Sequence, residues 1–308
     1  MASQWFVKVS GAFKEVNEAF VKVSGSWKEV QEGYIKVSGA WKQFYQAFVA
    51  TGYTQQTSST TVAVPTGANA IHIQAAVGGG SGGVGGAEYD KAGGESAGAG
   101  GASGGYISDK IFTVAEGETL TLTVGSGGAL SSGGYNTTAG NGGTTSLSGN
   151  STGSIFSLAG GTGGSSSGGG VQGPLRSNNP SSAGAATISA SAITTSSLSF
   201  KEANGASVTI GTAVTLDDGP VGSFNQSGNG VAGTNPGNCS GDNCQITGGV
   251  GGSSYNGNIS GGAGGVASSS SGGNGSRGSG AGGGGAQGQT AGGTGGGGEI
   301  YYRFLRLT

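Results

Sequence analysis

The chain is poor in charged residues and in prolines. Charged side chains make up 9% of its 308 residues, the formal net charge is −2, and there are only 5 prolines. Ordinary disordered proteins combine high charge with low hydrophobicity, so this composition disfavours ordinary disorder. Nucleic acid is not expected as a partner, because neutralising phosphates takes clustered lysines and arginines. Collagen is excluded, since its triplets are rich in proline.

Metal-binding residues are equally scarce. His72 is the single histidine, and the two cysteines, Cys239 and Cys244, lie in the stretch NCSGDNC. A structural zinc site takes four such ligands, so neither a metal site nor another cofactor site is predicted. The cysteines either form a disulfide that closes a small loop or remain free thiols, because pairing depends on a Cα separation that spacing does not give.

Long apolar runs and catalytic motifs are also missing. No stretch reaches 18 apolar residues and the N-terminus lacks the apolar block of a signal peptide, so membrane insertion is not expected. Residues 164–168 (GSSSG) match the nucleophile-elbow pattern without its strand-to-helix context, as chance allows in a Gly/Ser tract. His72 belongs to a strand pattern and is interpreted as an exposed or hydrogen-bonded sheet residue. No catalytic residues are assigned, and the chain is not expected to be an enzyme.

Glycine is abundant, with 74 residues, and its tracts have a period. In VGGGSGGVGGAEY (77–89) the side chains of Ser81, Val84 and Ala87 recur every third residue, and Ala159, Thr162 and Ser165 do the same. A polyproline-II-type helix has three residues per turn. The pattern therefore predicts polyglycine-II helices that pack side by side through backbone hydrogen bonds. Flexible Gly/Ser linkers are the alternative.

The first 50 residues contain a repeat with a 14-residue step. Its copies are FVKVSGAFKEV (6–16), FVKVSGSWKEV (20–30) and YIKVSGAWKQF (34–44). Alternating runs on both sides of Ser-Gly predict three tandem β-hairpins, with Val7 and Val9 on one side and Lys8 on the other. Single hairpins are marginal in water, so they should stack on each other or on neighbouring subunits. The lysines form either a solvated face that blunts sheet edges or a basic docking surface for an acidic partner.

Residues 51–308 alternate strand patterns with glycine tracts and contain an apparent insertion at about 174–226. The tail 299–308 is expected to return to the sheet begun by residues 60–77. Apolar alternation predicts that Ile71, Ile73, Ala75 and Val77 share one face, opposite His72 and Gln74. The expected fold is all-β: a hairpin-repeat domain (1–50), then a glycine-rich, β-sandwich-like domain (51–308) with a polyglycine-II bundle. The strand patterns are 60–65, 69–77, 106–114, 118–125, two within 197–216, and 299–308.

Isolated aromatic and polar residues interrupt the glycine tracts. Loops on a rigid frame commonly carry recognition, and Tyr and Asn suit contacts with sugars or polar protein loops. These residues are therefore candidate receptor contacts, with structural loop tips as the alternative. They are Tyr89, Tyr135, Asn136, Tyr255, Asn256, Asn258 and Arg277.

Two long stretches resemble the glycine-rich domain of bacteriophage tail-fibre and tail-tip proteins. They are VAVPTGANAIHIQAAVGGGSGG (62–83) and GGYISDKIFTVAEGETLTLTVGSGG (104–128), and FSLAGGTGG (156–164) and GGTGGGGEIYYRF (292–304) match the group's returning elements. The VKVSG repeats are similar to short hairpin repeats of phage structural proteins. The insertion at 174–226 departs from the group's simplest pattern.

The resemblance implies a virion fibre or tip adhesin. Residues 1–50 would attach to other virion proteins of the tail or capsid, and the glycine-rich domain would contact a bacterial surface glycan or outer-membrane protein. It also implies a homotrimer, assembled in the host cytoplasm and exposed on the particle exterior. Two alternatives stay open: a purely structural or capsid-decorating virion protein, and an ice-binding polyglycine-II protein.

Overall fold

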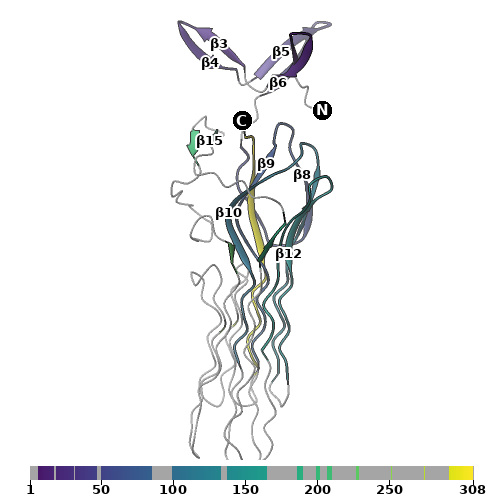
Figure 1. Cartoon of the computed structure of the whole chain (residues 1–308), viewed down its shortest axis with the longest axis vertical. Coiled ribbons are helices and arrows are strands. Elements are labelled where there is room, and N and C mark those ends of the chain that lie inside the picture. Colours follow the sequence, from purple (N-terminus) through teal and green to yellow (C-terminus); the bar gives the residue numbers. More distant parts are fainter. Residues whose placement is uncertain are drawn as a thin grey trace, which may run out of the picture.

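The chain is all-β, as predicted. The computed structural model describes residues 6–16, 19–30, 32–46, 50–84, 99–132, 137–164, 186–189, 199–201, 207–209, 227–228, 251, 274 and 291–307. Within these ranges it contains strands in antiparallel sheets and no helix (Figure 1). Accordingly, no described helix has the length and apolarity needed to cross a membrane.

Three two-stranded hairpins lie at the sequence repeats. Ser10 and Gly11 have φ values of 52° and 86°, and the Ser-Gly pairs of the other two hairpins repeat these values within a few degrees. Positive φ at both central residues is the signature of a type I′ turn, whose twist matches that of the flanking strands. The hairpins are β1 (Phe6–Val9) with β2 (Ala12–Glu15), β3 (Phe20–Val23) with β4 (Ser26–Glu29), and β5 (Glu32–Val37) with β6 (Ala40–Gln46).

Two five-stranded sheets form the body of the molecule. The first has the order β17 (Ser227–Gly228), β10 (Tyr106–Thr113), β9 (Ala70–Val77), β18 (Glu299–Leu305) and β7 (Thr54–Gln56). The second has the order β14 (Ala186–Ile188), β13 (Gly153–Leu158), β12 (Thr145–Gly149), β11 (Thr119–Thr123) and β8 (Thr60–Ala63). A separate pair, β15 (Ser199–Lys201) and β16 (Ser207–Thr209), falls within 174–226, the range predicted to be an insertion.

The two sheets share one hydrophobic core. Ile71 and Phe112 contribute to it from the first sheet, and Leu122 and Phe156 from the second. All four are fully buried, and the rings of Phe112 and Phe156 have centroids 6.2 Å apart. Burial of large apolar side chains between the sheets is the main favourable term in folding, so the core holds them together as a β-sandwich.

The prediction that the C-terminal tail returns to the sheet begun by residues 60–77 is confirmed for strand β9 and wrong for strand β8. β18 pairs with β9, as expected, and also with β7, but β8 pairs with β11 in the opposite sheet. A turn separates β8 from β9: Ala68 N–H donates to the Pro65 carbonyl (3.1 Å), and Gly67 has a φ of 85°. This turn carries the chain from one sheet to the other, so residues 60–77 do not form a single sheet edge.

The predicted common face of Ile71, Ile73, Ala75 and Val77 is also wrong. Opposite β18, Tyr301 pairs with Ala75 and Tyr302 with Ile73, which leaves Gln74 as an extra residue. A β-bulge of this kind reverses the faces of all residues beyond it. As a result Ala76 joins Ile71 and Ile73 in the main core, whereas Ala75 and Val77 pack with Tyr106 on the other face.

Beyond the sandwich, glycine-rich segments continue side by side, away from the hairpins (Figure 1). Segment 78–84 is completely buried among them. Its backbone N–H groups donate in rotation to three neighbouring segments, 99–105, 140–143 and 293–296. The bonds run from Gly78 to Gly105, Gly79 to Gly143, Gly80 to Gly296, Ser81 to Ala102, Gly82 to Gly140, Gly83 to Gly293 and Val84 to Ala99, with N···O distances of 2.8–3.0 Å.

Each neighbour therefore receives a bond from every third residue of segment 78–84. The same segment also accepts bonds from further neighbours, since Gly128 N–H donates to the Gly80 carbonyl and Gly161 N–H to the Gly79 carbonyl. The segments can approach this closely only because glycine has no side chain. A Cβ on Gly82 would overlap the Ala129 carbonyl oxygen, and one on Gly79 would overlap the Ser126 carbonyl oxygen.

Glu118 holds a turn and a loop of the second sheet together. This buried carboxylate accepts hydrogen bonds from Ala115 N–H (2.7 Å), Ser151 N–H (3.2 Å), Thr152 N–H (3.0 Å) and the Thr152 hydroxyl. Burial raises the pKa of Glu118, but the hydrogen bonds from Thr152, Ala115 and Ser151 outweigh it and hold the pKa below its ordinary value. The group thus stabilises the fold in its ionised form.

Replacing Gly82 by alanine should destabilise the chain strongly. The added methyl group must displace the backbone of segment 126–132, so we expect a loss of more than about 2 kcal/mol in the free energy of unfolding. Gly52 is the matched control: a Cβ there meets no atom within 4 Å, so Gly52→Ala should change stability by less than about 1 kcal/mol. Urea unfolding of both variants measures this, and equal small effects would contradict the close packing.

Glu118→Gln should cost about 1.5–3 kcal/mol at neutral pH, the value of hydrogen bonds to a charged group. A lowered native pKa means that this stability exists above the pKa of the unfolded chain and is lost as the pH falls through the native pKa. The gap between wild type and variant should therefore narrow in acid. Glu116→Gln, at an exposed position of the same turn, serves as the control. Thermal unfolding between neutral and acidic pH tests this, and a gap independent of pH would refute it.

Candidate interaction surfaces

All the candidate receptor contacts lie outside the described residues. This holds for Tyr89, Tyr135, Asn136, Tyr255, Asn256, Asn258 and Arg277, and also for Cys239 and Cys244. The flanks of one pair are described: the segments that precede Tyr135 and follow Asn136 in the sequence are adjacent, since Gly140 N–H donates to the Ala129 carbonyl (2.8 Å). The roles of these residues therefore stay predictions.

Side chains that could bind a metal or act in catalysis are few in the part of the chain that the structure describes. There, no group of three or more His, Cys, Asp or Glu side chains is placed to hold a metal ion. His72 is 4% exposed, and its Nδ1 lies 3.0 Å from the Tyr53 hydroxyl. Of the two states predicted for His72, the structure thus has the hydrogen-bonded one. The Tyr53 ring covers His72 on β9, with ring centroids 5.8 Å apart.

His72 is part of an aromatic and polar cluster on the outer face of the first sheet. The ring of Tyr53 stacks on Tyr301 with a centroid distance of 5.3 Å, and the Arg303 guanidinium lies 4.3 Å from the Tyr53 ring centroid. A cation over an aromatic face is attracted by the ring quadrupole. This cluster fastens the segment around Tyr53 to β9 and β18. Sequence reasoning missed it because 250 positions separate Tyr53 from Arg303.

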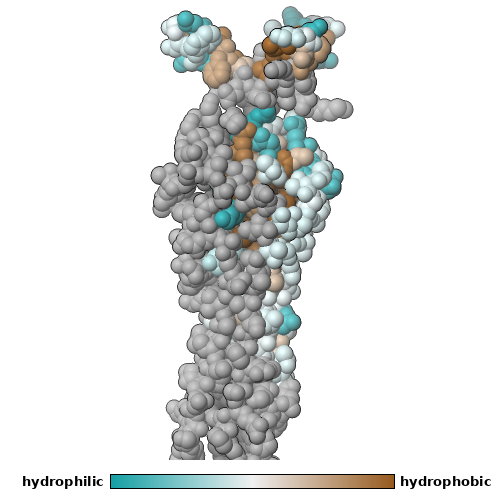
Figure 2. All heavy atoms as spheres, in the orientation of Figure 1, coloured by the Kyte–Doolittle hydropathy of each residue, from teal (hydrophilic) through white to brown (hydrophobic). Residues whose placement is uncertain are grey.

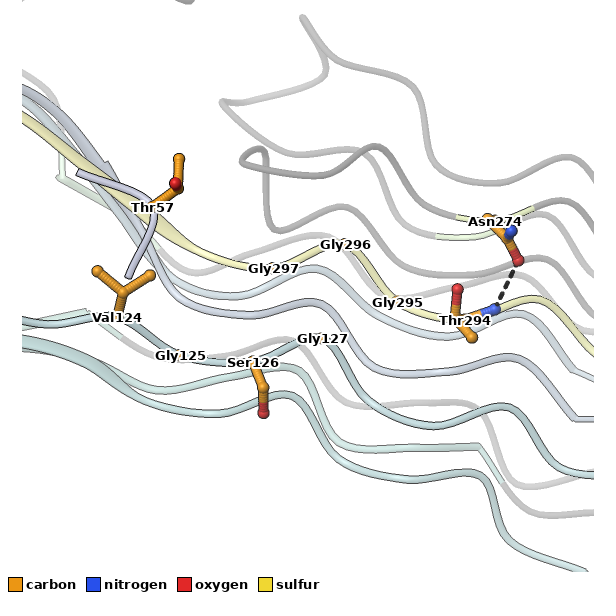
Figure 3. Close-up of a pocket in the computed structure, with 10 residues that line it drawn as sticks. All are labelled: Thr57, Val124, Gly125, Ser126, Gly127, Asn274, Thr294, Gly295, Gly296 and Gly297. Carbon is orange, nitrogen blue, oxygen red and sulfur yellow. Dashed lines mark hydrogen bonds between the residues drawn. The ribbon is translucent and has the colours of Figure 1, made fainter. Parts of the chain in front are cut away.

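A groove of about 570 Å³ runs along the glycine-rich segments (Figure 3). Its walls are the backbone of 125–127 and 294–297, with Thr57 and Val124 at one end. Asn274 also borders it, and its Oδ1 accepts a hydrogen bond from Thr294 N–H (3.0 Å). The described residues that line the groove offer backbone groups and small polar side chains, and none of them is ionisable.

Exposed small residues form two adjacent rows on the surface of the glycine-rich segments. One row is Ser126, Ala129 and Ser132, and the other is Thr138, Asn141 and Thr144. The rows lie side by side because Gly143 N–H donates to the Ser126 carbonyl (2.7 Å) and Gly140 N–H to the Ala129 carbonyl. Three-residue spacing in both rows makes this a regular, nearly uncharged face.

The hairpins are the most apolar exposed part of the described chain. Each places a lysine opposite an exposed aromatic ring on the neighbouring strand, with distances from Nζ to the ring centroid of 5.7 Å (Lys8–Phe13), 5.9 Å (Lys22–Trp27) and 6.0 Å (Lys36–Trp41). Figure 2 shows apolar and hydrophilic residues close together on the hairpins. Sequence reasoning did not pair these residues, although a two-residue Ser-Gly turn fixes the register that puts them opposite each other.

Comparison with known proteins gives a family for most of the chain. A family model described as a glycine-rich domain matches residues 54–305. That range contains both five-stranded sheets and the glycine-rich segments, and it leaves out the three hairpins. Among curated proteins, no sequence matches this chain. On the extent of the family match, the chain belongs to the glycine-rich domain family.

Proposed function

We propose that the glycine-rich segments form a polyglycine-II bundle and that the chain is a bacteriophage tail-fibre or tail-tip protein. In this proposal the bundle is a stiff rod that presents loops to the surface of the host cell. The loops carry Tyr89, Tyr135, Asn136, Tyr255, Asn256, Asn258 and Arg277 and contact a bacterial surface glycan or an outer-membrane protein. No catalytic role is proposed.

The hydrogen bonds of segment 78–84 carry this proposal. In a helix with three residues per turn, successive N–H groups point in directions about 120° apart. A segment with this geometry donates to a different neighbour at each of three successive residues and returns to the first neighbour at the fourth, which is the pattern of bonds observed. An interlocked bundle of this kind resists bending, because every segment is bonded on several sides.

A fibre protein needs one end for attachment and another for contact with the host, and the two ends of this molecule are different. The hairpins lie at the end of the sandwich opposite to the direction in which the glycine-rich segments run (Figure 1). In the proposal residues 1–50 attach to other virion proteins of the tail or capsid, the fibre is a homotrimer, and the rod points outward from the particle. The phage-like sequence stretches, such as 62–83 and 104–128, support this assignment by resemblance. A purely structural or capsid-decorating role is the alternative in which the loops contact virion proteins.

A second candidate function rests on the two exposed rows of small residues. Regularly spaced Ser, Ala, Thr and Asn side chains on a nearly uncharged face offer a repeating pattern of methyl and hydroxyl groups that an ice surface could match. A thermal-hysteresis measurement separates this function from adhesion, since ice binding predicts a freezing-point depression and a phage adhesin predicts none.

The adhesin proposal predicts that the full chain binds bacterial cells and that three tyrosines contribute to binding. Replacing Tyr89, Tyr135 and Tyr255 together by alanine should weaken binding at least about 30-fold, since the loss of one hot-spot tyrosine costs about 2 kcal/mol or more. Tyr34→Ala, in a hairpin, is the control and should leave cell binding within about twofold. Flow cytometry of labelled protein on a panel of bacterial strains measures both.

Unchanged thermal unfolding of the variants shows that they are folded. If the folded wild-type chain binds no strain and no isolated surface component, the adhesin proposal fails and the structural role becomes the better one.

A further inference from the structure

Large apolar side chains that are exposed in the described residues are concentrated in the hairpins. Outside the hairpins only Leu130 belongs to this set. Exposed apolar side chains concentrated in one region indicate an interaction site, and a two-stranded hairpin is marginal without a covering layer. The members in the hairpins are Val7, Val9, Phe13, Phe20, Val21, Val23, Trp27, Tyr34, Ile35, Val37 and Trp41.

Each hairpin has two unlike faces. Register places Lys22 opposite Trp27 on one face and Val23 opposite Ser26 on the other. We call the face that carries Val23 the aliphatic face. It carries Val7 and Val9 in the first hairpin, Val21 and Val23 in the second, and Ile35 and Val37 in the third, and these side chains are 41–52% exposed. Near the turn its cross-strand neighbours are small, namely Ala12, Ser26 and Ala40. A flat surface of β-branched side chains suits stacking against another sheet.

Pairing among the three hairpins cannot cover all three aliphatic faces. The β3–β4 ladder extends to Ala19 and Val30 through a bond from Val30 N–H to the Ala19 carbonyl (2.7 Å), and β5 begins at Glu32. Two Cα–Cα steps span at most about 7.6 Å, whereas stacked sheets lie about 10 Å apart. Hairpins β3–β4 and β5–β6 therefore cannot stack face to face at their connection. Moreover, three faces cannot pair off within one chain.

We propose that the aliphatic faces of the hairpins are covered by the same faces of a second copy of this chain. The repeated geometry supports this occupant. A partner must present a flat aliphatic surface three times at the 14-residue spacing of the repeats, and another copy does so by construction. Most soluble oligomers are closed, symmetric homo-oligomers, and aliphatic faces of different repeats can meet in a trimer as well as in a dimer. The proposal identifies one partner of the hairpin region, and it does not depend on the proposed adhesion.

The aromatic face is a poorer candidate for the buried side of this contact. Lys22 and Lys36 lie on it above Trp27 and Trp41, so burying that face would desolvate two ammonium groups. The turn-proximal part of the aliphatic face carries no charge. The lysines opposite Val21 and Ile35, Lys28 and Lys42, lie toward the open ends of the hairpins, where long side chains can extend to solvent.

Charge gives the contact a distinctive response to salt. Residues 1–50 contain six lysines and four glutamates, a difference of two positive charges, so two copies repel each other weakly. Salt screens that repulsion, and association through aliphatic faces should become tighter as salt is added. An acidic occupant would give the opposite response, because screening weakens attraction between unlike charges.

Sedimentation analysis of the full chain over a range of concentrations tests the proposal. The wild type should associate, and V21K/I35K should raise the dissociation constant at least about 100-fold, because two aliphatic side chains leave the contact. F20K/Y34K is the matched control. Phe20 and Tyr34 (50% and 49% exposed) adjoin Val21 and Ile35 (48% and 52%) in sequence but lie on the other face, so this variant should stay within about threefold of wild type.

The outcomes separate clearly. A wild type that is monomeric at all concentrations, equal losses in both variants, or an association that weakens with salt each overturn the proposal. The salt series needs no variant, so an unfolded hairpin in a lysine variant does not decide the question. Emission from Trp27 and Trp41 also reports whether the variant hairpins stay formed. A monomeric chain that still binds cells would leave the adhesin proposal standing.

Discussion

The glycine-rich part of this protein depends on hydrogen bonds between backbones that no side chain separates. Segment 78–84 is buried, yet its N–H groups have carbonyl partners on three neighbouring segments. Glycine loses more conformational freedom on folding than any other residue, and these segments bury little apolar area to offset that loss. Dense bonding is therefore the term that keeps them ordered, because a buried, unpaired backbone group would be unfavourable. Any residue that holds the segments apart removes several bonds at once.

The β-sandwich supplies what the glycine segments lack. Its core of large apolar side chains stabilises two sheets, and strands such as β9, β11 and β18 continue directly into, or follow from, glycine-rich segments. The sheets thereby fix the spacing and direction in which those segments start. Glu118 and the Tyr53–His72–Arg303 cluster brace loops at the outside of the sandwich. These charged and aromatic groups thus stabilise the sheets and their loops, whereas backbone hydrogen bonds hold the glycine-rich segments together.

The sequence predicted the strands better than their arrangement. Alternating and repeated residues located β8, β9, β10, β11 and β18 within a few positions, since local pattern determines which residues favour a strand. Sheet membership and facing depended on details that pattern does not contain. One extra residue, Gln74, moved Ala75 and Val77 out of the main core, and one turn at Pro65–Gly67 sent β8 to the opposite sheet. The strands β12 and β13 were missed, because their sequences (TSLSG and GSIFSL) contain too much Ser and Gly to stand out from the tracts around them.

The glycine-rich domain buries its large apolar side chains within one chain, whereas the hairpins leave theirs exposed. This difference indicates where copies of the chain can associate. In the glycine-rich domain the central segment is bonded on several sides within one chain, and large apolar side chains are buried in the sandwich. In the hairpins, valines, isoleucine and tryptophans remain exposed on short two-stranded ladders. In the described part of the body the large apolar side chains are already buried, so further contacts there add little, whereas the hairpins gain stability from any layer that covers them. Association through the hairpins would therefore leave the glycine-rich segments uncovered along their length, which the proposed role as a presenting fibre requires.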